Sequence, residues 1–151
     1  MTIEENLKKL GLEIPKAPDP VGNYKAYIKS GNLVFISGQL PINPNGKLIE
    51  GKIGLDLDYQ DGEIATKFAI LNVLGQLLRA TGDLNLIKKC VKIVGYYNCT
   101  ENFKDHPKLL NVASDLIANV FKQKGEHARA VLGVSSLPLN AAVELETIFE
   151  I

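Results

Sequence analysis

The sequence predicts an α+β fold: one domain over residues 1–151, with about six strands in a mixed sheet, two long helices on one face of that sheet and a short helix at the N-terminus. Three observations support this fold class. Apolar residues recur at helical spacing in two long segments, β-branched segments separate and follow these helices, and 46% of the residues are hydrophobic. A chain of 151 residues with this composition can bury a substantial core.

Residues 1–21 predict a short helix and a proline-rich lead. Thr2 and Glu5 are spaced as a capping box, and Gly11 is placed to end the helix. Three prolines between residues 15 and 20 then favour an extended or turning backbone. The stripe expected to dock this helix on the rest of the protein consists of Ile3, Leu7 and Leu10.

The next segment predicts a hairpin and a further strand. Residues 24–28 and the apolar run LVFIS flank a turn over residues 29–32, and the continuous apolar character of the second run is typical of a central strand. Asn45-Gly46 is a strong tight-turn signal, and one more strand is expected before the first long helix.

Two long amphipathic helices follow, separated by a strand over residues 91–100. The first helix covers residues 60–80 and should stop at Gly82, whereas the second should start at Asp105-His106-Pro107 with an aspartate cap and an early proline. The apolar stripe expected on the first helix is Ile64, Phe68, Leu71, Leu74 or Gly75, and Leu78. The stripe expected on the second is Leu109, Ala113, Leu116, Ile117 and Val120.

The C-terminal segment predicts two strands, ARAVLGV and AAVELETIFE, joined into a hairpin-like pair. Successive side chains of a strand point to opposite faces, so each strand has one apolar face and one face with charge. If the apolar faces share a core, Arg129 and Glu144 lie together on the opposite face. A cation and a carboxylate would then line one pocket.

Two helices cover only one side of such a sheet. The other side would expose a mixed apolar and charged patch that includes Arg129, Val131, Glu144 and Ile148. We therefore expect another subunit to cover it, which gives an oligomer with clefts between subunits.

Composition and charge disfavour several functional classes. Seventeen basic and seventeen acidic residues cancel, which argues against nonspecific nucleic-acid binding. No apolar run approaches the length of a membrane span, and the charged N-terminus differs from a signal peptide, so a cytoplasmic protein without a membrane role is expected. Cys90 and Cys99 lie at opposite ends of one predicted strand, roughly 30 Å apart, and should be reduced thiols. His106 and His127 are both expected to face solvent, and they have no companion ligands for a metal. No cofactor is expected.

The run GNLVFISGQLPINPNGK, an asparagine in the second helix and the closing pattern A-R-x-V-x-x-V-x-x-L-P-x-x-x-x-V-E-x-E resemble the Rid/YjgF family of reactive-intermediate deaminases. The resemblance covers residues 20–151. It implies a chorismate-mutase-like fold, a homotrimer with a site at each subunit interface, and cofactor-free hydrolysis of small 2-imino or 2-enamino acids to 2-keto acids and ammonia.

The resemblance also implies roles for individual residues. Arg129 corresponds to the arginine that binds the substrate carboxylate, and Glu144 to the glutamate that positions the attacking water. The remaining substrate-binding positions are Tyr24 as an aromatic wall, the pair Ser37-Gly38, and Asn111.

Three features depart from the family pattern. Val131 stands where many members have a cysteine, His127 stands where they have a proline, and residues 1–21 are additional. The lead resembles that of a longer branch often labelled as endoribonucleases.

Simpler interpretations stay open for each residue. Arg129 could form a structural ion pair with Glu144 or Glu146, and Tyr24 could be an edge aromatic residue. A trimer that binds small carboxylates without turning them over is the main alternative function. Endoribonuclease activity ranks last because the chain has no net charge.

Overall fold

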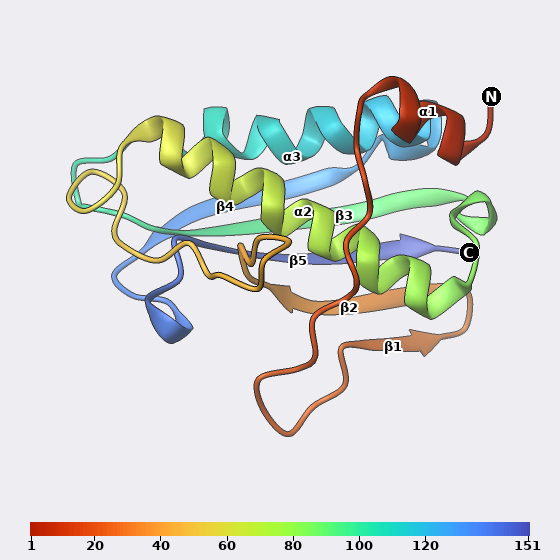
Figure 1. Ribbon diagram of the computed structural model, residues 1–151, viewed down its shortest axis with the longest axis horizontal. Coiled ribbons are helices and arrows are strands. Elements are labelled where there is room, and N and C mark those ends of the chain that lie inside the picture. The colour runs from red at the N-terminus through yellow and green to blue at the C-terminus, as the bar shows by residue number, and fades with distance from the viewer.

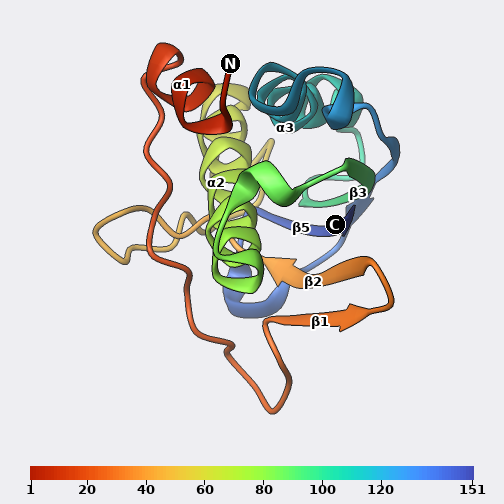
Figure 2. The ribbon, with the colours of Figure 1, turned by 90° about the vertical axis from the view of Figure 1, so that its right-hand side faces the viewer.

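A computed structural model describes residues 1–151 and shows one sheet with helices packed on one face (Figures 1 and 2). The sheet has five strands rather than about six. The segment expected to provide the additional strand, residues 40–57, is a loop that makes only isolated bridges, and the tight turn at Asn45-Gly46 lies within it. In chain order the elements are α1 (Ile3–Lys9), β1 (Tyr27–Ser30), β2 (Leu33–Gln39), α2 (Tyr59–Thr81), β3 (Lys89–Asn98), α3 (His106–Phe121), β4 (Ala128–Val134) and β5 (Val143–Glu150).

The strands are arranged in the order β1-β2-β5-β3-β4, with β3 and β4 parallel and the other neighbours antiparallel. The predicted hairpin of residues 24–37 is present, although β1 begins three residues later than expected. The predicted pairing of the two C-terminal strands is wrong, because β3 lies between them. Helix α3 carries the chain back across the sheet, so β4 joins β3 in parallel, and β5 then takes the central position.

One face of the central strand β5 is buried along its whole length. Val143, Leu145 and Phe149 are fully buried and Thr147 nearly so, as the predicted alternation requires. Its other face carries Glu144, Glu146 and Ile148, and no helix covers that side (Figure 2).

Helix α3 packs on the sheet through the predicted stripe, all five residues of which are buried. Asp105 precedes the helix as expected, but its carboxylate makes no capping hydrogen bond. Gly82 ends α2 in the left-handed conformation, also as expected. None of the helices is long and apolar enough to cross a membrane.

The apolar stripe predicted for α2 is not the side that faces the sheet. Ile64 and Leu78 are 49% and 37% exposed. The lead crosses α2 on this side, so closely that a Cβ atom at Gly75 would come within 2.8 Å of the Pro15 carbonyl oxygen (Figure 1). The middle of α2 is therefore buried on two sides, which blurs its periodicity. Of the predicted stripe, only Leu71 and Leu74 belong to the main core. The other α2 residues in this core are Ala65, Ala69, Ile70, Val73, Leu77 and Ala80.

Helix α1 has the predicted capping box between Thr2 and Glu5 and lies against α3 (Figure 2). Leu7 is buried, whereas Leu10 is 42% exposed because it caps the end of the helix rather than continuing the stripe. The buried Asn6 donates a 2.8 Å hydrogen bond from Nδ2 to the Val120 carbonyl oxygen, a link that the apolar pattern does not reveal.

The contrast between Leu7 and Leu10 gives a stability prediction. Leu7→Ala should lower the free energy of unfolding by about 2–4 kcal/mol, because it removes buried apolar volume from the α1–α3 contact. Leu10→Ala is the matched control and should change it by less than about 0.5 kcal/mol. Urea unfolding of the two variants tests this; equal losses would show that α1 does not dock through Leu7.

Candidate functional site

Glu144 lies on the uncovered face of β5, directly beside the backbone of Gly38. A Cβ atom at Gly38 would collide with the Glu144 carboxylate, so glycine is required for this approach. The register of β2 against β5 shifts between Ile36 and Gln39, and this irregularity places Gly38 next to Glu144. The site therefore contains a carboxylate that packs directly against the backbone of Gly38.

Two features of its surroundings shift the pKa of the Glu144 carboxyl upward. Burial raises the pKa of the Glu144 carboxyl, and the like charge of Glu146 raises it further. Glu146 accepts a 2.7 Å hydrogen bond from the Tyr96 hydroxyl, and this bond raises the pKa of Tyr96. Glu144 accepts no hydrogen bond within the chain, so its oxygens are available to a water or a ligand.

Ser37 and Tyr24 lie near Gly38, but neither side chain forms a hydrogen bond with Glu144. Ser37 Oγ donates to the Lys25 carbonyl oxygen at 2.6 Å, and the Tyr24 hydroxyl oxygen accepts from the Val21 N–H at 3.3 Å. Tyr24 is 46% exposed, so its ring forms an open wall. Ser37 is thus a positioned strand-end residue, and its hydroxyl already has an acceptor.

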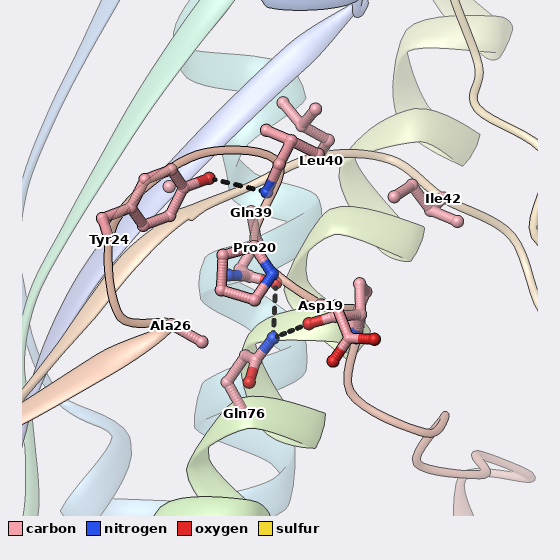
Figure 3. Close-up of a pocket in the computed structure, with 11 residues that line it drawn as sticks. Asp19, Pro20, Tyr24, Ala26, Gln39, Leu40, Ile42 and Gln76 are labelled. Carbon is pink, nitrogen blue, oxygen red and sulfur yellow. Dashed lines mark hydrogen bonds between the residues drawn. The ribbon is translucent and has the colours of Figure 1, made fainter.

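Tyr24 and Gly38 also line a small pocket between the lead and α2 (Figure 3). At its base Gln76 Nε2 donates to the Pro18 carbonyl oxygen at 2.6 Å and to Gln39 Oε1 at 3.4 Å. The pocket has a volume of about 30 Å³, which suits one or two water molecules. It is too small for a substrate and acts as a polar backing to the Gly38 segment.

Arg129 does not share a face with Glu144, and this expectation is wrong. Arg129 lies opposite Ile93, a fully buried residue of β3, and its side chain reaches α3 on the helix side of the sheet. Its Nη1 donates to Ser114 Oγ at 3.1 Å and its Nη2 to the Pro107 carbonyl oxygen at 3.3 Å. An ion pair between Arg129 and Glu144 or Glu146 within one chain is therefore absent.

The prediction of which face of β4 is buried was wrong, because both faces of this strand carry apolar residues. The core was expected behind Ala130, Leu132 and Val134, but Leu132 is 43% exposed and Val131 packs against the core instead. As an edge strand, β4 buries little on either face. Alternation was correctly predicted, but the sequence did not indicate which face was inside.

Asn111 lies with Arg129 rather than with Glu144. It is exposed on α3, four residues after Pro107 and three before Ser114, so it shares a helical face with both Arg129 acceptors. The predicted site residues thus form two groups. The Glu144 group is Tyr24, Ser37, Gly38 and Glu144, and the Arg129 group is Asn111 and Arg129.

The two groups lie on opposite faces of the sheet. Glu144 is opposite Tyr96 of β3 and Arg129 is opposite Ile93, so their Cα atoms are about 14 Å apart with side chains pointing away from each other. One chain cannot bring both to a single small molecule.

Sequence reasoning missed the partners of His127, which was expected to be solvated. His127 is half-buried, with Nδ1 2.6 Å from the Gly125 carbonyl oxygen and Nε2 2.9 Å from Ser114 Oγ. The available signal was positional. Ser114 lies one helical turn after Asn111, and His127 precedes Arg129 by two residues, just before β4 begins, so continued alternation gives both side chains the same face.

The cysteines are unbridged and buried, as predicted. Burial raises the pKa of Cys90 to about 12 and also raises that of Cys99. His106, expected to face solvent, instead packs edge-on against Phe103, with Nε2 3.4 Å from Cys99 Sγ. Both thiols therefore stay protonated at neutral pH, which makes them poor nucleophiles.

A protein-family model described as "YjgF/chorismate_mutase-like, putative endoribonuclease" matches residues 4–150 of the chain. Protein TCP17 of Trypanosoma cruzi is 38% identical over 150 residues, which cover 99% of this chain and 94% of that protein. A 2-iminobutanoate/2-iminopropanoate deaminase of Dermatophagoides farinae is 27% identical over 91% of this chain and 92% of its own length. The crystal structure of a "putative endoribonuclease" from Shewanella oneidensis is 34% identical, with a TM-score of 0.95 over the whole of both chains.

The like charge beside Glu144 gives a titration prediction. Glu146→Gln should lower the pKa of the Glu144 carboxyl, because it removes the repulsion that disfavours the Glu144 carboxylate. Carbon-13 NMR of labelled glutamate measures this pKa directly. Glu150→Gln, at the far end of the same strand face, is the control and should leave it unchanged. No shift in Glu146→Gln would show that the two carboxylates do not interact.

Proposed function

The chain belongs to the YjgF/chorismate mutase-like family, and we propose that it hydrolyses small 2-imino acids, or their 2-enamino tautomers, to 2-keto acids and ammonia. The observation that supports this most directly is the Glu144 carboxyl, free of hydrogen bonds and held against Gly38 with a raised pKa. The similarity to a 2-iminobutanoate/2-iminopropanoate deaminase supports the same reaction.

Arg129 supplies the binding half of the proposed site. Its guanidinium donates one N–H to Ser114 Oγ and one to the Pro107 carbonyl oxygen, which leaves three of its five donors for a ligand. Two parallel donors match the two oxygens of a carboxylate, and arginine keeps its charge at any working pH. Asn111, exposed on the same face of α3, can add an amide hydrogen bond.

Glu144 supplies the proton-transfer group of the proposed site. As a carboxylate it accepts a proton from a water molecule while the water oxygen bonds to the imine carbon, and it then returns that proton to the nitrogen. The resulting carbinolamine passes its hydroxyl proton to the amino nitrogen through Glu144, the C–N bond breaks to release ammonia, and the C–O bond becomes the carbonyl of the keto acid. One water is consumed and one ammonia released, and no oxidant or reductant is needed. A raised pKa suits a group that must both accept and return a proton near neutral pH.

The separation of the two groups requires a second copy of the chain. We propose a cyclic homotrimer in which the Arg129 group of one subunit meets the Glu144 group of its neighbour. The two groups are different surfaces, so the contact is heterologous, and a threefold rotation between neighbours closes it into a ring. The uncovered sheet face also exposes Ile28, Phe35 and Leu132 by 54%, 40% and 43%, which is apolar surface that a neighbour would bury.

A binding protein without turnover would use the same Arg129 group. Val131, half-buried on the Arg129 face of β4, provides neither a proton donor nor an acceptor there, so any proton transfer depends on Glu144. Ammonia release from freshly generated 2-iminopropanoate distinguishes the enzyme from the binding protein.

The assembly gives the third prediction. Static light scattering at micromolar concentration should give three times the 16.5 kDa chain mass. Phe35→Lys should lower this mass, because it places an unpaired charge on the apolar face. A monomeric parent protein would contradict the composite site.

The separate roles proposed for Arg129 and Glu144 give the fourth prediction. Arg129→Lys should weaken 2-oxobutyrate binding by about 1.5–3 kcal/mol, because lysine keeps the charge but loses the two-pronged geometry. Glu144→Gln should leave this binding nearly intact and slow ammonia release at least a hundredfold, on the scale of general base catalysis. Calorimetry and a coupled ammonia assay give the two readouts.

Matched controls separate these effects from general damage. Arg79→Lys alters the only other arginine, which pairs with Asp19 on the surface, and should change neither readout. Glu150→Gln alters a carboxylate on the same face of β5 and should also be neutral. Unchanged affinity in Arg129→Lys, with the assembly intact, would return Arg129 to a structural role.

A further inference from the structure

We propose that His127 is a positioning residue that fixes the guanidinium of Arg129 through the hydroxyl of Ser114. The inference rests on the proposed function, since it assigns a task to Arg129 in carboxylate binding. The three side chains form a continuous chain of contacts from the Gly125 carbonyl oxygen through His127 and Ser114 to Arg129, at 2.6, 2.9 and 3.1 Å.

The donors and acceptors in this chain have one consistent arrangement when the imidazole is neutral. A carbonyl oxygen can only accept, so Nδ1 of His127 carries the proton and donates to Gly125. Nε2 is then an acceptor, and the Ser114 hydroxyl donates its hydrogen bond to it. With its proton directed to His127, Ser114 Oγ presents a lone pair to Arg129 Nη1.

Both ends of the chain are fixed to α3. Ser114 belongs to that helix, and Gly125 packs so tightly on it that a Cβ atom would come within 3.0 Å of the Ala118 Cα. The Pro107 carbonyl oxygen, the second acceptor for Arg129, also lies on α3. Two hydrogen bonds to acceptors on α3 thus fix the position of the guanidinium.

This support matters because Arg129 is an exposed residue on an edge strand. A free arginine side chain samples many rotamers, and ordering it on binding opposes affinity. Two acceptors on α3 order the guanidinium beforehand and turn its remaining N–H groups outward from the helix. His127 contributes by fixing the orientation of the Ser114 hydroxyl.

The experiment combines a spectroscopic readout with ligand binding. Nitrogen-15 NMR of the imidazole at pH 8.5 should show His127 protonated at Nδ1, and Ser114→Ala should move the Nε2 resonance. Ser114→Ala and His127→Ala should each weaken 2-oxobutyrate binding about three- to tenfold, the scale of one hydrogen bond. The KM for the imine should rise by a similar factor with kcat little changed, because Glu144 is untouched.

Three further variants make the test specific. The double variant should bind no more weakly than either single variant, because both break the same chain. Ser114→Thr keeps the hydroxyl and should bind within twofold of the parent. His106→Gln alters the only other histidine and should leave affinity unchanged.

The outcomes separate this inference from the proposed function. Protonation of His127 at Nε2 overturns the positioning role whatever the activity. Parent-like affinity in Ser114→Ala, with Arg129→Lys weakened, also overturns it and leaves the proposed function standing. Parent-like affinity in Arg129→Lys overturns the proposed function, and the positioning role with it.

Discussion

The position of β3 between β4 and β5 is the constraint on which the rest of the structure depends. β3 pairs in parallel with β4 and antiparallel with β5, so the two C-terminal strands flank it instead of pairing with each other. Side chains alternate between faces along each strand, and the two registers against β3 place Arg129 on the helix side and Glu144 on the uncovered side. A shift of either register by one residue would bring both charges to one face and remove the core contacts of that strand.

Local signals in the sequence predicted local structure well. The capping box of α1, the left-handed Gly82 at the end of α2 and the buried stripe of α3 all depend on residues within a few positions of one another. The alternation in β5 was equally clear, because one of its faces is apolar except for Thr147. The fold class followed from these elements, and the resemblance to the Rid/YjgF family pointed to the family and its topology.

Non-local features could not be predicted from such patterns. The buried side of α2 was misassigned because residues 12–20, far away in sequence, cover a second side of that helix. The phase of β4 was misassigned because an edge strand with Ala130, Val131 and Leu132 has no distinctly polar face. The contact of His127 with Ser114 joins the segment just before β4 to helix α3, and neither residue stands out by type.

The placement of Arg129 and Glu144 on opposite faces has a genetic consequence. In the proposed ring of subunits, a chain altered at Arg129 still offers an intact Glu144 to one neighbour, and a chain altered at Glu144 still offers an intact Arg129 to the other. Co-expression of the two inactive forms would rebuild complete sites at some subunit boundaries. The two alleles would therefore complement each other, whereas two different alterations within the Glu144 group would not.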